Sequence, residues 1–427
     1  MIPENDPSLR SFIDVAADSD FPIQNLPFGI FTPTADDTPR VGVAIGDYVL
    51  DLACLEARGH FDTPLLTGKA LFQQSSLNPL MALGRNTARE VRAIVSQLLR
   101  HDTPTLRDNV QLRERAFFLQ SDVTLLLPVT IGSYTDFYSS KEHATNIGRM
   151  FRPDAEALLP NWTSLPVGYD GRANMVVVSN TPFHRPQGQL KLNNNEPAIF
   201  APSRALDVEV EVAFVVGQGN KMGEPIPIAE APEHVFGVVL MNDWSARDIQ
   251  KWEYVPLGPF LAKSFCTTIS PWVVTLDALA PFAKPGPAQQ PTPLNHLQRQ
   301  QDYNFDIHLE LALQAETMEH PQTIATTNYR HMYWDYCQQL AHHTSNGCAM
   351  QTGDLYGSGT ISGPTQAEAG SLIELTWGGR DPIQLDNGEQ RVFLADNDQA
   401  IIRGWCQGDG YRVGFGEVRG QVLPAVK

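Results

Sequence analysis

The chain has 427 residues, of which 42% are hydrophobic and 19% are charged, a composition typical of folded globular proteins. At about 100–200 residues per domain, this length allows two or three domains and a substantial buried core. Acidic residues outnumber basic ones by 48 to 31, and the formal net charge is −17. This balance argues against nucleic acid and membrane surfaces as partners, because both select basic patches.

Targeting signals are absent from the sequence pattern. No apolar run approaches the ~18 residues of a membrane helix, and Val235–Met241 is about the longest. The start of the chain, Met1–Asp6, has neither the basic end nor the apolar stretch of a signal peptide. The five cysteines are scattered and form no C-x-x-C motif, as expected for reduced thiols. We therefore expect a soluble, cytoplasmic protein.

The first part of the chain predicts a small barrel-like domain. The expected elements are strands over 28–31, 40–45 and 48–52, and helices that begin near residues 78 and 86. No group of chemically active residues stands out there, so packing or support of a dimer is the expected role. The run Leu125–Pro128 marks the boundary, which gives domains over 1–128 and 129–427.

The second part alternates between strand-like runs and turn signals. Strands are expected over 205–216, 234–241, 272–276, 305–313, 372–377, 401–405 and 412–415. One helix is expected over 327–342, and the Pro- and Gln-rich stretch 281–301 is expected to be exposed. This domain is therefore predicted to be mostly β, as a rolled or sandwiched sheet.

Three carboxylates alternate with valines in the segment 207–211. Because strand side chains alternate between faces, Asp207, Glu209 and Glu211 would share one face of a strand. One interpretation is a half-solvated strand with a polar outer face. The other is a metal site, because confining several carboxylates beside an apolar run requires a cation or shifted pKa values. The pattern leaves both open.

A fourth acid, Asp243, ends an apolar run. The segment 246–254 that follows predicts a helix, on which Arg247, Gln250 and Tyr254 share one face at i, i+3 and i+7. The simpler interpretation is a surface helix in which Asp243 and Arg247 form a weak ion pair. The alternative places Asp243 on a metal ion, with Arg247 and Gln250 as hydrogen-bond donors to a substrate oxygen.

Two further candidates are a histidine and a lysine. Asp136 and His143 are seven residues apart, so a helix would place them on one side; a lone histidine is more often structural than catalytic, and spacing leaves both roles open. Lys263 lies among apolar residues, either as a surface lysine with a buried stem or as a partner of an anion. Since the candidate ligands are carboxylates without a thiol, Ca²⁺ or Mg²⁺ is favoured over zinc. The basic residues among them suggest an anionic small-molecule substrate.

A resemblance to a known protein family rests on the run MNDWSARDIQKWEY at 241–254 and on the segments 131–152, 165–173, 207–214, 242–268 and 357–374. With these segments the chain closely resembles the fumarylacetoacetase (fumarylacetoacetate hydrolase) family, nearly from end to end. The resemblance implies a mostly β protein with some α structure. It implies a small N-terminal SH3-like barrel domain over 1–128, a C-terminal mixed β-roll over 129–427 that binds metal, and a homodimer.

The resemblance also implies a role for each candidate residue. The divalent metal ion, Ca²⁺ or Mg²⁺, would be held by Asp136, Glu209, Glu211 and Asp243, with Lys263 and Thr267 beside it. His143 would be the general base, oriented by Glu374, and the oxyanion would be stabilised by Arg247, Gln250 and Lys263. The residues that would bind or lie near the substrate are Tyr138, Arg152, Tyr169, Gln250, Tyr254 and Thr360.

The implied activity is metal-dependent hydrolysis of 4-fumarylacetoacetate to fumarate and acetoacetate, the last step of tyrosine and phenylalanine breakdown. Cleavage of a carbon–carbon bond beside a carbonyl requires an activated water and a stabilised carbanion. His143 would take the proton of the water near pH 7, and a metal-stabilised enolate would leave. Two alternatives stay open: a related hydrolase of acylpyruvates or other β-diketo acids, and a non-catalytic metal-binding scaffold, which would need no base.

Three positions depart from the family pattern. Ala262 precedes the lysine where glycine is usual, Cys266 replaces another small residue, and Asp170 stands where histidine is common. A Cβ at a close approach would shift Lys263 slightly. We expect these departures to affect the fit of the substrate rather than to abolish activity.

Overall fold

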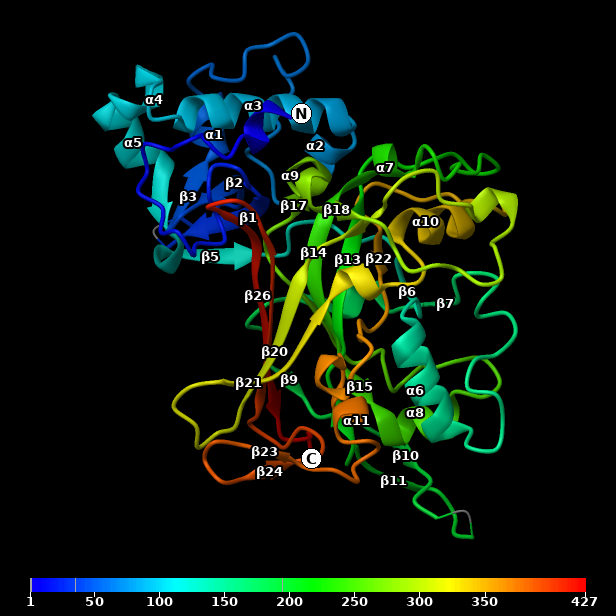
Figure 1. Ribbon diagram of the computed structural model, residues 1–427. Helices are drawn as coiled ribbons and strands as arrows, with labels where there is room; N and C mark the ends of the chain where they lie inside the picture. The colour runs from blue at the N-terminus through cyan, green and yellow to red at the C-terminus, as the bar shows by residue number, and fades with distance from the viewer. Residues whose placement is uncertain (1, 35, 194) are drawn as a thin grey trace.

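A five-stranded antiparallel sheet forms the N-terminal unit, in the order β4-β3-β2-β1-β5. The computed structural model describes residues 2–34, 36–193 and 195–427, and Figure 1 shows this unit in blue and cyan at one end of the molecule. Its elements are β1 (Phe28–Pro33), β2 (Arg40–Ile45), β3 (Tyr48–Asp51), β4 (Phe117–Leu119), β5 (Val123–Leu126), α1 (Leu52–Glu56), α2 (Asn78–Met81), α3 (Arg85–Leu99), α4 (Pro104–Arg107) and α5 (Val110–Ala116). The sheet is barrel-like, as predicted.

Helix α3 closes the core of this unit and contacts the larger one. Its buried Val91 and Val95 recur at helical spacing and pack in one hydrophobic cluster with β1 and β2. On another face, Arg85 Nη2 lies 2.5 Å from Asp277 Oδ1, and Arg89 Nε lies 2.7 Å from Asp277 Oδ2. Burial alone would raise the pKa of Asp277, but the two guanidinium groups lower it below its ordinary value. The ionised Asp277, on α9 (Leu276–Leu279), thus ties the two units together.

The larger unit is built on an eight-stranded mixed sheet. Its order is β7-β6-β22-β13-β14-β16-β8, and β17 also pairs with β14. The strands are β6 (Tyr134–Phe137), β7 (Gly168–Asp170), β8 (Val176–Val178), β13 (Val210–Val216), β14 (Val235–Asp243), β16 (Thr267–Ile269), β17 (Val274–Thr275) and β22 (Leu355–Gly357).

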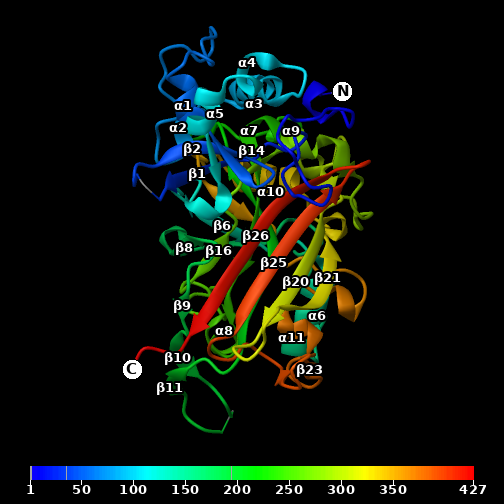
Figure 2. The same cartoon turned by 90° about the vertical axis from the view of Figure 1, so that its left-hand side faces the viewer.

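A second sheet packs against the first, in the order β21-β20-β25-β26-β9. Its strands are β9 (Phe183–His184), β20 (His308–Gln314), β21 (Gln322–Asn328), β25 (Gln399–Gln407) and β26 (Arg412–Leu423). Figure 2 shows β21, β20, β25 and β26 side by side along the length of the molecule. Side chains of both sheets, such as Leu240 and Ile402, form one hydrophobic cluster. The mostly β fold predicted from the sequence is confirmed.

Strand β13 is buried on both faces, which explains its nearly continuous apolar sequence. Val212 and Phe214 join the cluster with the second sheet, whereas Ala213 and Val215 join the cluster of the N-terminal unit. Because side chains alternate, Glu211 falls on the face of Ala213 and Val215. The fold therefore places a carboxylate between hydrophobic layers.

The other elements are short. They are α6 (Lys141–Phe151), α7 (Ala231–His234), α8 (Arg247–Glu253), α10 (Tyr336–Thr344), α11 (Leu372–Leu375), β10 (Gln187–Leu190), β11 (Ile199–Pro202), β12 (Leu206–Asp207), β15 (Ser245–Ala246), β18 (Ala283–Lys284), β19 (Asn304–Phe305), β23 (Ile383–Gln384) and β24 (Gln390–Arg391). Within the described residues, no helix combines the length and the apolar character needed to cross a membrane.

Several strand predictions differ from the structure. The strands expected over 205–216 and 305–313 are each interrupted, because β12 ends at Asp207 before β13 begins and β19 ends at Phe305 before β20 begins. Of the stretch 272–276, only Val274–Thr275 forms a strand, β17. The stretch 372–377, expected as a strand, contains helix α11. The cause is a distant cap: Asp207 accepts hydrogen bonds from the backbone N–H groups of Leu372 (2.7 Å) and Ile373 (3.1 Å). A local pattern cannot show a cap supplied from so far along the chain.

Two further predictions were partly right. The helix expected over 327–342 begins only at Tyr336, because Asp335 caps it in a capping box. Before it, β21 ends at Asn328 and a 3-10 helix follows over Tyr329–His331. The stretch 281–301, expected to be exposed, contains the fully buried Leu297.

Candidate active site

Four carboxylates meet inside the larger unit. Asp136 lies on β6, Glu211 on β13, Asp243 at the end of β14, and Glu209 just before β13. One oxygen of each lies within 4.8 Å of the others. All four are buried, the most exposed by only 4%. Glu209 and Glu211 thus lie close together, as the alternation predicts, but they lie in the interior and not on a solvated outer face.

The pairing of neighbouring strands brings these acids close together across the sheet. Asp136 lies opposite Gly357 of β22, Asp243 lies opposite Thr267 of β16, and β13 with Glu211 runs between β22 and β14. A Cβ at Gly357 would lie 2.6 Å from Asp136 Oδ1 and 3.0 Å from Glu211 Oε2. Only a glycine leaves the space between these two carboxylates open.

Positive charge reaches one side of the cluster. Lys263 Nζ donates hydrogen bonds to Glu209 Oε2 at 2.5 Å and to Asp243 Oδ2 at 2.7 Å. Burial alone would raise the pKa of Glu209, but Lys263 and Arg247 lower it far below its ordinary value. Lys263 is itself buried, which contradicts the interpretation as a surface lysine and supports the one in which it meets an anion.

On the other side of the cluster, none of the described residues brings a positive charge into hydrogen-bond contact. Burial and the neighbouring carboxylates raise the pKa of both Asp136 and Glu211 well above ordinary values. Asp136 Oδ1 and Glu211 Oε1 are buried without a hydrogen-bond partner among the described residues. A divalent cation supplies both a counter-charge and a partner for these oxygens. Because every donor is an oxygen, the residues present fit a hard cation such as Ca²⁺ or Mg²⁺.

Two hydroxyl groups hold Asp243 in place. Thr267 Oγ1 donates to Asp243 Oδ1 at 2.8 Å, and the Tyr169 hydroxyl donates to Asp243 Oδ2 at 3.0 Å. Tyr169, expected near the substrate, therefore has its hydroxyl engaged by a carboxylate of the cluster.

A histidine–carboxylate pair lies beside the cluster. His143 Nδ1 lies 2.6 Å from Glu374 Oε2, and both side chains are buried. Ser140 caps α6 by accepting the backbone N–H of His143, and Tyr138 packs edge-on against the imidazole with ring centroids 5.4 Å apart. Since an ionised carboxylate only accepts hydrogen bonds, Nδ1 carries a proton and Nε2 is free to accept one. His143 lies close enough to Glu209 to be one of the groups that lower the pKa of that carboxyl.

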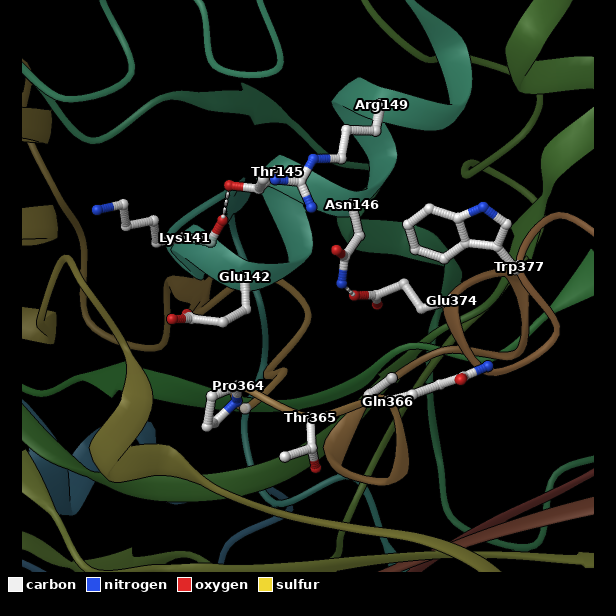
Figure 3. A pocket seen from close by; sticks show the side chains of 12 residues that line it. Lys141, Glu142, Thr145, Asn146, Arg149, Pro364, Thr365, Gln366, Glu374 and Trp377 are labelled. Atoms are coloured by element: carbon white, nitrogen blue, oxygen red, sulfur yellow. Dashed lines mark hydrogen bonds between the residues drawn. The ribbon is translucent and has the colours of Figure 1, made fainter. Parts of the chain in front are cut away.

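Glu374 receives several hydrogen bonds besides that from His143. Ser371 Oγ (2.6 Å) and Ser362 Oγ (3.0 Å) donate to Oε2, and Asn146 Nδ2 donates to Oε1 at 3.0 Å. Burial would raise the pKa of Glu374, but His143 and these donors lower it below its ordinary value. Figure 3 shows Asn146 and Glu374 on the wall of a cavity of about 380 Å³ between α6 and the segment before α11. The Glu374 carboxylate is thus held ionised and hydrogen-bonded.

Arg247 does not form the surface ion pair with Asp243 that was one interpretation of the sequence. Its side chain is 4% exposed, and it binds Asp207 Oδ2 through Nε and Glu209 Oε1 through Nη1, both at 2.7 Å. Nη1 also donates to Gln250 Oε1 at 3.2 Å. Nη2 is buried without a hydrogen-bond partner among the described residues, so it is available to a bound molecule.

The remaining candidates lie around this centre with fewer mutual contacts. Arg152 donates to the carbonyl of Ala157, and its Nε has no hydrogen-bond partner in the described part of the chain. Tyr254 lies against Phe151 at the end of α6, with ring centroids 6.1 Å apart. The buried Thr360 forms no side-chain hydrogen bond with any other candidate among the described residues.

One carboxylate fixes the segment that leads into Lys263. Glu253, at the end of α8, accepts hydrogen bonds from the backbone N–H groups of Phe260 (2.8 Å), Leu261 (3.2 Å) and Ala262 (2.8 Å). The methyl group of Ala262 is buried in a small apolar cluster. The departure from glycine is therefore accommodated beside the lysine.

The other two departures are sequence neighbours of Thr267 and Tyr169, the two residues whose hydroxyl groups bind Asp243. Cys266 is buried, and burial raises its pKa to about 12, which keeps the thiol protonated and unreactive. Asp170, on β7, is exposed.

Comparison with known proteins agrees with this geometry. The family model described as "Fumarylacetoacetase N-terminal" matches residues 24–128, and "Fumarylacetoacetate (FAA) hydrolase C-terminal" matches residues 133–423. The chain belongs to the fumarylacetoacetate hydrolase family. It is 55% identical over 417 residues to human fumarylacetoacetase, covering 97% of this chain and 99% of that protein. It is 50% identical to the fumarylacetoacetase of Arabidopsis thaliana, covering 98% of this chain and 99% of that protein.

The fold of the family is also seen in a solved structure. The fumarylacetoacetate hydrolase of Exiguobacterium antarcticum is 17% identical, covers 93% of this chain and 99% of that chain, and superposes with a TM-score of 0.51. At this identity the likeness concerns the fold alone.

Several residues at the site were not assigned from the sequence. Asn146 lies one helical turn after His143, a spacing that places both on one face, but nothing in the sequence pairs either with Glu374. Ser371 directly precedes α11, yet that helix was expected as a strand. Gly357 has no local signal, because its role depends on β6 and β13 lying on either side of it.

Proposed function

We propose that this protein is a fumarylacetoacetase, which hydrolyses 4-fumarylacetoacetate to fumarate and acetoacetate. The observation that carries the proposal is the buried His143–Glu374 pair beside four buried carboxylates, in a chain 55% identical to human fumarylacetoacetase over 97% of its length. A scaffold that only binds metal would have no use for a buried histidine–carboxylate pair, whose burial costs free energy.

Asp136, Glu209, Glu211 and Asp243 hold the divalent ion, and Thr267 and Lys263 fix the carboxylates around it. When bound, Ca²⁺ or Mg²⁺ supplies a Lewis acid that polarises the ketone oxygens of a 1,3-diketone. The orphaned oxygens of Asp136 and Glu211 support this assignment. Calorimetric titration of chelator-treated protein with each ion distinguishes the two metals, and identical, millimolar binding of both would contradict a dedicated site.

His143 acts as the general base at Nε2. It takes a proton from water, whose oxygen attacks the carbonyl carbon of the fumaryl group, and Glu374 stabilises the resulting imidazolium. The carbon–carbon bond then breaks, its electron pair stays with the acetoacetate fragment, and the proton returns from His143 to that fragment. One water is consumed, and each product receives one of its parts.

Arg247, Gln250 and Lys263 stabilise the oxyanion that forms when water attacks. The free Nη2 of Arg247 supports this role, because a buried donor without a partner is costly unless a substrate oxygen meets it. Tyr138, Arg152, Tyr254 and Thr360 bind the rest of the substrate, together with Gln250 and the ring of Tyr169. The free Nε of Arg152 supports binding of a carboxylate end.

We also propose a domain boundary after residue 128, a homodimer and a cytoplasmic location. The dimer is supported by the loop after α8, where Val255, Leu257 and Phe260 are 66%, 94% and 58% exposed, an apolar surface that a second copy would bury. Sedimentation equilibrium tests it: Leu257→Asp should shift a dimer to a monomer, and a monomeric wild type would refute it. The free cysteines support a reducing compartment, and cell fractionation tests this.

Turnover decides between the enzyme functions. Purified protein with Ca²⁺ or Mg²⁺ should consume fumarylacetoacetate and release fumarate and acetoacetate in equal amounts. A preference for acylpyruvates would replace the proposal with a related β-diketo-acid hydrolase. Metal binding without consumption of either substrate would indicate a scaffold.

A further inference from the structure

The two oxygens of Glu374 have different surroundings. Oε2 accepts hydrogen bonds from His143 Nδ1, Ser362 and Ser371, whereas among the described residues only Asn146 donates to Oε1. Because an ionised carboxylate is only an acceptor, the amide nitrogen of Asn146 must face it, which fixes the orientation of the amide. Asn146 therefore determines the plane of the carboxylate that His143 contacts.

Helix α6 couples Asn146 directly to the histidine. Asn146 follows His143 by three residues, so both side chains lie on one face of the same helix and reach the same carboxylate. Asn146 and Glu374 both line the cavity of Figure 3, whose other walls include Thr145, Arg149 and Trp377. Removing the amide would open Oε1 to water and leave the carboxylate free to rotate.

We propose that Asn146 is a positioning residue for the His143–Glu374 pair. It holds the Glu374 carboxylate so that Oε2 receives the Nδ1 proton of His143, and this leaves Nε2 oriented to take the proton of water. The kinetic part of this inference rests on the proposed hydrolase function. The structural part, the geometry of the histidine–carboxylate hydrogen bond, does not.

The expected size of the effect is intermediate. Loss of the carboxylate itself in such a pair lowers kcat by about 10⁴-fold, because the imidazole adopts the wrong tautomer. A residue that only orients such a partner typically contributes about 10–100-fold. Water from the adjoining cavity replaces part of the lost hydrogen bond, so we expect Asn146→Ala to lower kcat about tenfold, with KM changed less than about twofold.

A double-mutant cycle tests whether Asn146 acts through Glu374. In the Glu374→Gln background, Asn146→Ala should lower kcat by less than about twofold, because the carboxylate that it orients is gone. The matched control is Thr145→Ala. Thr145 lines the same cavity, and within the described part of the chain its hydroxyl bonds only to the carbonyl of Lys141. A tenfold loss in both backgrounds, or an unchanged kcat in Asn146→Ala, would overturn the proposal.

A spectroscopic measurement keeps the inference testable without turnover. The Nδ1 proton of His143, in a short hydrogen bond to a carboxylate, should give a downfield proton resonance in ¹⁵N-histidine-labelled protein. Asn146→Ala should move this resonance upfield, Thr145→Ala should not, and Ca²⁺ affinity should be the same in both variants. A resonance that Asn146→Ala leaves in place would refute the positioning role, whereas an inactive wild type would refute only the proposed function.

Discussion

Replacing Glu211 with glutamine should stabilise the metal-free protein while weakening its metal binding. Glu211 is fully buried and lies with three other carboxylates whose oxygens are within 4.8 Å of one another. At that separation and an effective dielectric constant of ~20, each pair of like charges costs about 3 kcal/mol. Because protonation of an acid in the cluster relieves part of this repulsion, we expect the free energy of unfolding to rise by about 1–3 kcal/mol in Glu211→Gln.

The matched variant Glu209→Gln should behave in the opposite way. Glu209 pairs with Lys263 and Arg247, so its loss removes one of the two carboxylate partners of each buried cation and should cost about 1.5–3 kcal/mol. Urea unfolding in the presence of a chelator measures both variants, and calorimetric titration with Ca²⁺ should show weaker binding in each. If Glu211→Gln destabilises the metal-free protein as much as Glu209→Gln does, the cluster is not a repulsive site that awaits a cation.

Three further predictions address the general base, the glycine between two carboxylates of the cluster, and the contact between the units. His143→Ala should lower kcat by about 10²-fold or more and leave Ca²⁺ binding intact, as steady-state kinetics and calorimetry will show; lost metal affinity would mean that the histidine is a ligand. Gly357→Ala should weaken Ca²⁺ binding about 10–100-fold, because the new Cβ would lie 2.6 Å from Asp136 Oδ1. Unchanged affinity in the same titration would show that metal binding does not need the space that Gly357 leaves open. Asp277→Asn should lower stability at pH 7 but not at low pH. The native pKa of Asp277 is depressed by Arg85 and Arg89, so its contribution is present above an unfolded pKa of about 3.9 and is lost as the pH falls through the lower native value. Denaturant unfolding at pH 7 and pH 3 measures this difference, and a gap that persists or widens in acid would contradict the assignment.

Local pattern predicted the part of the site that lies on strands. The alternation around Glu209 and Glu211, and the acid Asp243 at the end of an apolar run, follow from the period of a strand and from burial on both faces. The same alternation grouped Asp207 with them, but the strand breaks after Asp207, which binds Arg247 and caps α11 instead. Whether a polar face lies outside or inside depends on which layers cover it, and the strand itself does not encode that.

The His143–Glu374 pair could not be predicted from the spacing of residues along the sequence. Glu374 lies 231 residues after His143, on a short helix whose sequence resembles a strand. The helix forms because a carboxylate from β12 caps it, so its existence depends on tertiary structure that is assembled elsewhere. Only the family resemblance pointed to this residue.

The way in which Glu253 binds three successive main-chain groups has a consequence for sequence variation. Backbone amides are the same in every residue except proline, so substitutions at the exposed Phe260 and Leu261 leave the anchor intact as long as no proline enters. The outer surface of this loop can therefore diversify, for example to suit a different neighbour, while the ammonium group of Lys263 keeps its place. The exposed side chains of this loop and the buried Lys263 are therefore under separate evolutionary constraints.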